Sequence, residues 1–351
     1  MRFDARGLRL DAHIPQLFII AFLVLLAGAA LRLDSPVGLM LGDSLVRLGM
    51  NGVLALSLVP MLNVGAGLNF GLPVAISAGL LGMCLAVNCR LRGLPGFFAA
   101  IFFACVAGVV LGWLYGRILN RVKGREEIAA AFVGFSFISI MNFFWATAPF
   151  SNPAMLWPIG GKGMRPAIGL RGYFAGVLNS LGSFTLFGVT VPTGLLVFFG
   201  LLCLGVYLFF RTSLGRAMIA TGESEPFARM AGIRVERMRL LGVILSTVIG
   251  AVGICVYAQS YGFIELYDAP LMMAFPAASA VLAGGCLGGR ALVRHVVLGT
   301  YLFQTTYVLS GPVANGLMVP EAAEIIRMLV SNGIILYALI YEGTRRRKHA
   351  A

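Results

Sequence analysis

Charged residues are scarce in this chain of 351 residues: they make up 12% of it, against roughly 25% in an ordinary soluble domain. Hydrophobic residues make up 59% and form repeated apolar runs that short polar connections separate. This composition excludes an ordinary soluble domain. It predicts an all-α polytopic membrane protein in which residues 1–351 form a single transmembrane domain.

Three further absences narrow the function. No acidic or basic residue lies in the middle of an apolar run, which argues against a proton- or sodium-coupled transporter. The tract Gly160–Gly163 lacks the spacing of a nucleotide-binding P-loop, so the chain is not expected to hydrolyse ATP. The six cysteines and three histidines show no metal-ligand or catalytic spacing, so we expect no metal, no cofactor and no enzyme activity.

The net charge of +13 could indicate a nucleic-acid partner, but basic loops beside anionic membrane lipid explain it better, and no nucleic-acid partner is predicted. The first apolar run is not followed by a cleavage site of small residues and is expected to be a retained span. With the N-terminus inside, 19 of the 27 lysines and arginines fall in inner connections. The positive-inside rule then predicts a bacterial inner-membrane protein with both termini cytoplasmic.

About ten transmembrane helices are predicted, and several are shorter than the ~20 residues that an untilted helix needs, which implies tilted or broken helices. The predicted spans are Leu17–Leu31, Leu45–Leu62, Leu72–Val87, Phe97–Leu119, Ile128–Ala146, Val191–Phe210, Leu240–Tyr261, Leu271–Leu287, Leu292–Leu309 and Ile325–Ile340. Tyr173–Val189 could be an eleventh span, but its polar residues and three glycines favour a surface or partly re-entrant helix. It would belong to a long outer loop at 147–190 that contributes to an outer gate.

A basic and polar segment, Arg211–Arg239, lies between two apolar runs and is predicted to be a cytoplasmic loop. Within it, Ser224–Ala231 is predicted to be one short helix, with Ser224 as N-cap, Pro226 in the first turn and Gly232 just past the end. A short capped helix between two spans offers a rigid contact to a soluble partner. The residues expected to couple the chain to that partner are Glu223, Ser224, Glu225, Pro226, Phe227, Arg229 and Gly232.

Neutral polar and aromatic residues within or beside the spans suit the pathway of a small neutral solute, although each of the polar ones also fits a hydrogen bond between helices. The candidates are Asn51, Asn63, Asn69, Phe70, Ser136, Phe137, Asn142, Trp145, Gln259, Gln304 and Thr305.

Two glycine patterns have more than one interpretation. The stretch Asn63–Gly71 is either a broken helix pair beside the pathway or a tight cytoplasmic turn with glycines for close packing, and both place it in the protein interior. Gly108, Gly112 and Gly116 form a small-residue ridge that favours packing within one bundle over a dimer contact.

The segment Arg211–Gly253 resembles the core signature of permeases of ABC importers for ribose, other simple sugars and nucleosides, a group related to the branched-chain amino acid permeases. The matching residues are Arg211, Thr212, Gly215, Ala220, Gly222, Glu223, Ala228, Gly232 and Ile233, with Ser224 where the family usually has Asn. Leu62–Pro73 resembles a second family region, with Gly67 in place of an acidic residue.

The resemblance implies a type II importer fold that works by alternating access. It also implies two ATP-binding cassette ATPase subunits that hold ATP and Mg, a second permease that is identical or paralogous, and an extracytoplasmic solute-binding protein. The expected cargo is a nucleoside, a simple sugar or a riboflavin-like compound. Two alternatives stay open: a secondary carrier or channel that needs no ATPase, and an integral membrane enzyme, which the lack of a catalytic constellation disfavours.

Overall fold

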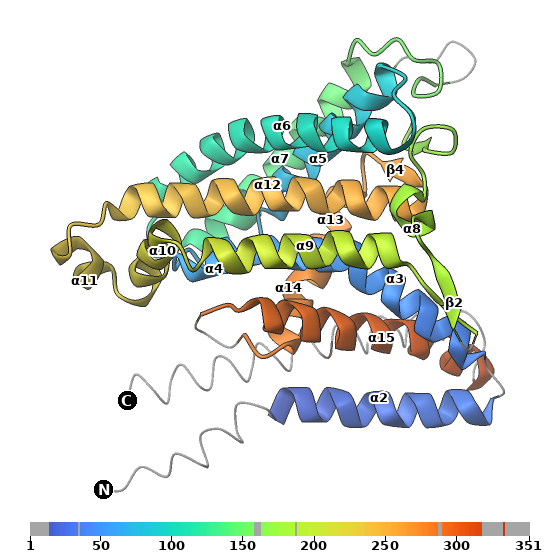
Figure 1. Cartoon of the computed structure of the whole chain (residues 1–351). Helices are drawn as coiled ribbons and strands as arrows, with labels where there is room; N and C mark the ends of the chain where they lie inside the picture. The colour runs from blue at the N-terminus through green and yellow to red at the C-terminus, as the bar shows by residue number, and fades with distance from the viewer. Residues whose placement is uncertain are drawn as a thin grey trace, which may run out of the picture. The chain divides into compact units, whose positions relative to one another are not determined.

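The computed structural model describes residues 14–33, 36–157, 163–186, 188–286, 290–317 and residue 333. Most of the regular structure in these ranges is α-helical (Figure 1). The chain divides into two compact units. The larger comprises Gly49–Ser183 and Pro192–Ala278, and the smaller comprises Met1–Leu48, Phe184–Val191 and Ser279–Ala351.

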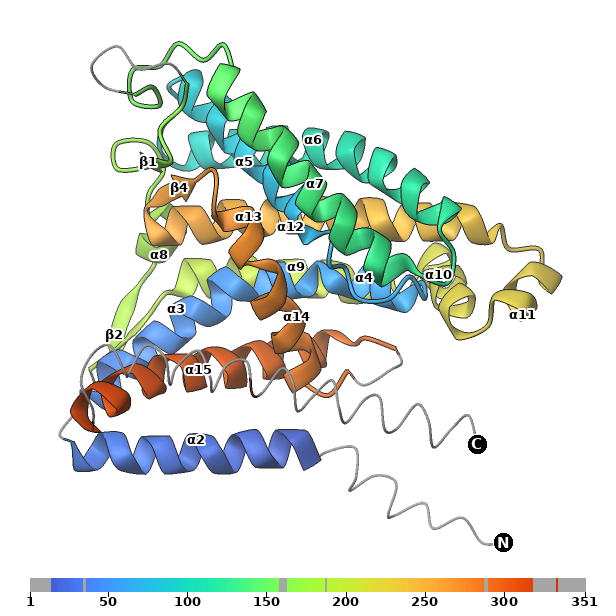
Figure 2. The same ribbon diagram turned by 180° about the vertical axis from the view of Figure 1, so that it is seen from behind.

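Three long helices, α5 (Leu72–Asn88), α6 (Gly93–Arg121) and α12 (Val235–Tyr261), form the centre of the larger unit and pack closely on one another. Each is a long apolar sequence that Pro does not interrupt, because Pro73 and Pro95 lie in the first turns of α5 and α6, where a missing N–H costs nothing. Helix α7 (Glu126–Thr147) runs beside α5 (Figure 2).

Glycines set the distance between these three helices. A Cβ atom at Gly82 of α5 would lie 2.7 Å from the Ala100 carbonyl oxygen of α6, so the two backbones meet directly. At Gly108 and Gly112 of α6, a Cβ would lie 3.2 and 3.1 Å from backbone atoms of α12. The predicted ridge therefore packs within one bundle, as the sequence favoured.

The remaining helices of the larger unit are shorter or lie at its edges. They are the second half of α3 (Val37–Leu56), α4 (Leu58–Asn63), α8 (Val177–Ser180), α9 (Thr193–Phe209), α10 (Ser213–Glu223), α11 (Glu225–Met230), α13 (Ala269–Met272) and the first part of α14 (Ala274–Ala283).

The described residues are mostly helical, as predicted, but they also include four short strands of three residues each. In the larger unit, β1 (Ala167–Gly169) pairs antiparallel with β4 (Phe263–Glu265), with Ile168 opposite Ile264. In the smaller unit, β2 (Phe184–Leu186) pairs antiparallel with β3 (Val189–Val191). The sequence did not reveal them because pairing partners such as β1 and β4 lie far apart along the chain, and each strand is too short for an alternating pattern.

The region 173–189 is not an eleventh span. In place of the predicted surface or re-entrant helix it holds the four-residue α8 and most of the β2–β3 hairpin. Glycines with positive φ, at Gly176 and Gly182, interrupt any longer helix there.

Within the described residues, four helices are long and apolar enough to cross a membrane: Gly38–Asn63, Gly93–Arg121, Glu126–Thr147 and Val235–Tyr261. The number rises to five if α9 and α10, which meet at a 75° bend, count as one span. Shorter apolar helices at Ile19–Arg32, Leu72–Asn88 and Ala269–Ala283 coincide with further predicted spans. The predicted span Ile325–Ile340 and both chain ends lie outside the described residues, and the count of ten stays a prediction.

In the smaller unit, α2 (Ile14–Arg32) packs on α15 (Val293–Leu317). Ala30, Met40, Leu309 and Val313 form one buried apolar cluster there. The guanidinium of Arg47 lies 5.2 Å from the centre of the Tyr307 ring, a cation–π contact that shields a charge within the apolar unit.

Candidate functional site

The polar segment Arg211–Arg239 folds into α10, α11 and the start of α12, and within it the sequence had predicted only α11 as a helix. Thr212 begins α10, its hydroxyl accepting a hydrogen bond from the Gly215 amide at 3.2 Å. A side chain at Gly215 would collide with the backbone of Phe209, so glycine permits the sharp bend after α9. The chain thus leaves an apolar helix and turns at once into a polar one.

Helix α11 begins and ends as its sequence predicts. The Ser224 hydroxyl accepts a hydrogen bond from the Phe227 amide at 3.4 Å, and Pro226 lies in the first turn. At the other end Gly232 has φ +78°, and the amides of Gly232 and Ile233 donate to the carbonyls of Arg229 and Ala228 at 3.0 and 2.9 Å. These two bonds are a Schellman motif, so the helix is closed at both ends.

Ion pairs fasten α11 to its neighbours. Lys123, just after α6, donates to both Glu225 and Glu236 at 3.1 Å. Arg229 pairs with the same two carboxylates, at 2.7 Å from Glu225. Arg239 of α12 pairs with Glu126 of α7 and lies 3.9 Å from Glu225.

The cations around Glu225 favour its charged form. Hydrogen bonds from Arg229 and Lys123 lower the pKa of Glu225 below its ordinary value, against a smaller opposing effect of partial burial. Glu225 is therefore ionised at neutral pH and holds α11 to the end of α6.

Helix α10 contacts the turn between α4 and α5. A Cβ at Gly65 would lie 2.9 Å from the Gly222 Cα, and one at Gly222 would meet the Asn63 carbonyl oxygen. Only glycine allows this approach of two backbones, and Gly65 also has φ +76°. Most of the stretch Asn63–Gly71 is buried, and at the exposed Gly65 it contacts the polar segment.

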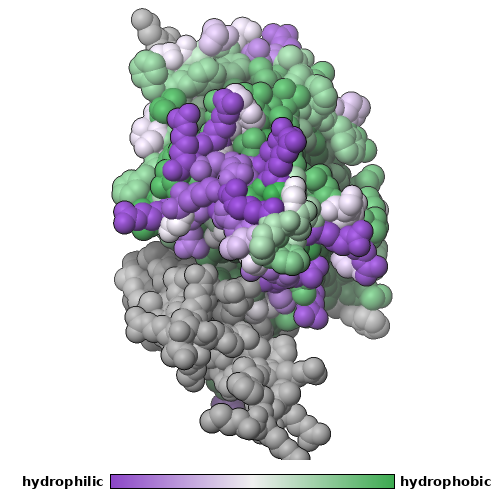
Figure 3. Space-filling view, turned by 90° about the vertical axis from the view of Figure 1, so that its left-hand side faces the viewer, coloured by the Kyte–Doolittle hydropathy of each residue, from purple (hydrophilic) through white to green (hydrophobic). Residues whose placement is uncertain are grey.

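The outer face of α11 carries two exposed apolar side chains. Phe227 is 60% exposed and Met230 is 81% exposed, whereas Ala228 is fully buried. Figure 3 looks at the end where α10 and α11 lie in Figure 1, and hydrophilic residues gather there beside hydrophobic ones. A rigid helix with exposed apolar anchors among charged residues is typical of a protein-binding surface.

Four residues in the ion pairs of this site were not among the sequence candidates: Lys123, Glu126, Glu236 and Arg239. They come from the ends of other helices, and no pattern in the sequence joins them to α11. Met230 was also missed, although its place in the predicted helix beside Phe227 could have indicated it. Glu223 is exposed at the end of α10.

The predicted pathway residues do not share one environment. Asn69 is buried: its Nδ2 donates to Ser246 and its Oδ1 accepts from Tyr115, both at 2.9 Å. Gln259 is buried, accepts from the Leu178 amide at 3.2 Å and thereby holds α8 to α12. Both residues form hydrogen bonds between elements. This is the other role that fits a polar residue in a span, besides contact with the solute.

Other candidates lie on α7 and next to it. Ser136 is exposed, and Phe70 contacts the ring of Phe275 at a centroid distance of 5.9 Å. Within the described residues, Asn142 Oδ1 and the fully buried Trp145 Nε1 have no hydrogen-bond partner. One acceptor and one donor thus lie one turn apart on α7.

The last candidates lie elsewhere. Asn51 and Asn63 belong to α3 and α4 of the larger unit, and Asn63 is buried. Gln304 and Thr305 are buried on α15 in the smaller unit. A pathway role for these residues stays a prediction.

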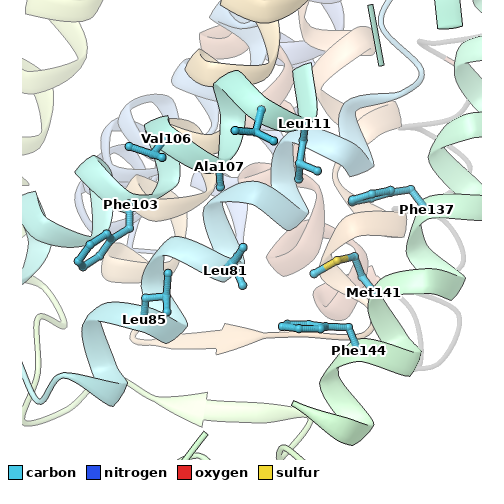
Figure 4. A pocket seen from close by; sticks show the side chains of 10 residues that line it. Leu81, Leu85, Phe103, Val106, Ala107, Leu111, Phe137, Met141 and Phe144 are labelled. Atoms are coloured by element: carbon cyan, nitrogen blue, oxygen red, sulfur yellow. The ribbon is translucent and has the colours of Figure 1, made fainter. Parts of the chain in front are cut away.

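Phe137 lines an apolar groove between α5, α6 and α7 of about 370 Å³ (Figure 4). Ten side chains line it, none of them polar: Leu81, Leu85, Phe103, Val106, Ala107, Val110, Leu111, Phe137, Met141 and Phe144. Such a lining offers no hydrogen bond to a polar solute, so the groove is not the site expected for one.

The long apolar helices are those of a protein that crosses the membrane several times. Residues 40–339 match the family of the branched-chain amino acid transport system permease component, and the chain belongs to this family. The family is one of transport permeases, in agreement with the resemblance found in the sequence.

Individual relatives are more distant. The autoinducer 2 import system permease protein LsrC of Yersinia pestis (strain Pestoides F) is 26% identical over 232 residues, which cover 65% of this chain and 60% of the relative. The same protein of Yersinia pseudotuberculosis serotype O:3 (strain YPIII) gives the same identity and coverage. The match thus spans about 60% of the length of these curated relatives.

One solved structure is described as an inward-facing conformation of a metal-chelate type ABC transporter. It has a TM-score of 0.44 and 17% identity, and the match covers 86% of this chain and 85% of that one.

Proposed function

We propose that this chain is the membrane-spanning permease subunit of an ATP-binding cassette importer. In this proposal it adopts a type II permease fold of about ten helices, with both termini in the cytoplasm. It moves a small neutral solute inward, of the nucleoside, simple-sugar or riboflavin-like class. The family match supports the permease role, and the name of the LsrC relatives supports import.

One observation carries the proposal: α11 is a short helix, closed by caps at both ends, with Phe227 and Met230 exposed on its surface. Residues 211–239 would be the cytoplasmic coupling loop, and α11 would be the contact for an ATPase subunit. Because side-chain and backbone caps fix both ends of α11, a displacement of its surface moves the whole helix.

The partners follow from this role. Two ATPase subunits bind ATP and Mg and dock under α11 of each of two permeases, which are either identical or paralogous. An extracytoplasmic binding protein delivers the solute to the outer face, where residues 147–190 would form part of the gate. ATP binding moves the coupling helices together, and the pathway changes the side to which it opens.

The proposal is tested by replacing Gly232 in the complex with its ATPase and binding protein. Valine at φ +78° costs about 1–2 kcal/mol and distorts the closed end of α11. We expect Gly232→Val to insert normally and to hydrolyse ATP with much less solute taken up per ATP. Gly232→Asn should stay near the native ratio, because Asn tolerates this conformation.

Gly262→Val is the matched control, since Gly262 lies just past the end of α12 with φ +94° and an added Cβ there would meet no atom within 4 Å. It should keep the native ratio of uptake to ATP hydrolysis. The proposal is overturned if no ATP-binding subunit copurifies with the native chain, as expected for a secondary carrier. An unchanged ratio in Gly232→Val would also count against it.

A further inference from the structure

Two neighbouring carboxylates in the first turn of α7 hold different parts of the larger unit. Glu126 pairs with Arg239 at the start of α12. Glu127 accepts a hydrogen bond from the Leu68 amide at 3.1 Å, within the turn between α4 and α5. The start of α7 is therefore joined to α12 on one side and to the α4–α5 turn on the other.

The pair of Glu126 and Arg239 is largely withdrawn from solvent. The Arg239 side chain is 7% exposed and that of Glu126 is 13% exposed, whereas the side chains in the ion pairs of Lys123 and Arg229 are 35–49% exposed. A buried charge needs its partner, because the low-dielectric surroundings solvate it poorly. This ion pair is therefore expected to persist while the exposed ones exchange with water.

Arg239 also lies close to α11, the helix proposed to contact the ATPase subunit. Its Nη1 lies 3.9 Å from the second carboxylate oxygen of Glu225, in the first turn of α11. The other oxygen of Glu225 is occupied by Lys123 and Arg229. Arg239 is thus the buried cation that contacts both α11 and α7.

We propose that Arg239 is a positioning residue that transmits displacement of α11 to α7, and through Glu127 to the α4–α5 turn. This inference rests on the proposed function, since it assumes that an ATPase displaces α11. Loss of the arginine leaves α11 attached to the chain and to Lys123 but removes its polar connection to α7.

The test uses the complex with ATPase and binding protein, reconstituted in liposomes, and measures ATP hydrolysis and solute uptake separately. Arg239→Gln should still copurify with the ATPase and hydrolyse ATP, while uptake per ATP falls roughly tenfold. Arg237→Gln is the matched control, because Arg237 is exposed on the same helix. It should leave the ratio unchanged.

A charge reversal separates transmission from simple loss of stability. Arg239→Glu alone places like charges together, and adding Glu126→Arg restores an ion pair of opposite polarity. The double variant should regain insertion, because the ion pair between α12 and α7 is restored, and a double-mutant cycle isolates this pairwise effect. It should not regain the coupling ratio, because the carboxylate placed at position 239 would repel Glu225 of α11. If Arg239→Gln fails to insert, the double variant decides: insertion without coupling supports the inference, and insertion with native coupling overturns it.

The two proposals fail in different ways. If the native chain brings down no ATPase, the proposed function is wrong. If the native complex is coupled and Arg239→Gln has the same uptake per ATP, only the role of Arg239 is wrong.

Discussion

The centre of the larger unit and its α10–α11 end are held together by different means. Helices α5, α6 and α12 meet through glycine and small side chains, so that backbone lies against backbone. Helix α11 is fastened by caps and by the exposed ion pairs of Lys123 and Arg229. The first arrangement tolerates no added atom, whereas the second consists of contacts that can break and form again.

This difference suits a protein in which the displacement of one helix moves other helices. Close packing of small residues resists deformation, because cores of this density have no room for a second arrangement. Exposed ion pairs contribute little to stability and rearrange at low cost. A helix held in this way can shift as a rigid piece while the bundle beside it keeps its packing.

The largest effect is expected where the close packing is broken. Alanine at Gly82 places a Cβ against the backbone of Ala100 and Ala104, which forces α5 and α6 apart. Overpacking of this kind costs about 1–3 kcal/mol. We expect Gly82→Ala to lower the thermal unfolding midpoint in detergent and the amount of protein in the membrane.

Gly200→Ala in α9 is the matched control, since no atom lies within 4 Å of its added Cβ. Alanine is a better helix former than glycine by roughly 1 kcal/mol, so this variant should be at least as stable as the native chain. If both variants behaved alike, the glycines of α5 would not be setting the distance between the helices.

A second loss of stability is expected from the polar network inside the same bundle. Replacing Asn69 by Leu leaves Tyr115 and Ser246 without the hydrogen bonds they make to it. An unsatisfied buried polar group costs about 1–3 kcal/mol, so the unfolding midpoint of Asn69→Leu should fall.

Removal of all three polar groups should recover most of this loss, because no group then lacks a partner. The variant with Asn69→Leu, Tyr115→Phe and Ser246→Ala tests this. A triple variant that transports solute as well as the native complex would contradict a pathway role for Asn69. One that folds well but no longer transports would support that role.

The sequence predicted those features that depend on neighbours along the chain. Ser224, Pro226 and Gly232 specify the ends of α11 within nine residues, and the spacing of Gly108 and Gly112 specifies a flat helix face. Both predictions were confirmed by the structure. The family resemblance was confirmed by the match over residues 40–339.

Features that depend on distant segments could not be read in the same way. Lys123 and Glu225 are 102 residues apart, and Arg239 and Glu126 are 113 apart, so no local pattern joins them. The same holds for β1 and β4, which lie far apart along the chain and come together only in the folded structure. Polar residues in spans indicated no single pathway, because a hydrogen bond between helices and a solute contact require the same residue types.

The smallest effect concerns acid. The pKa of Glu225 is lowered in the folded chain by Arg229 and Lys123, so its contribution is complete above the unfolded pKa, near 4.5. It is lost as the pH falls below that value, when the carboxyl group gains a proton and the two cations keep only Glu236 as a partner. Attachment of α11 should therefore be constant between about pH 8 and 5.5 and weaken only in more acid solution.

A spin label at Met230, which is exposed on α11, can report this. In a Cys89→Ser background, which removes an exposed cysteine, the mobility of the label should rise only below about pH 4.5. Glu225→Gln should show the higher mobility at every pH, because its side chain cannot ionise. A rise that begins well above that pH, near neutrality, or one that persists in Glu225→Gln, would mean that another group holds α11. The attachment of α11 would then depend on that group, and not on the exchangeable ion pairs that distinguish α11 from the glycine-packed helices α5, α6 and α12.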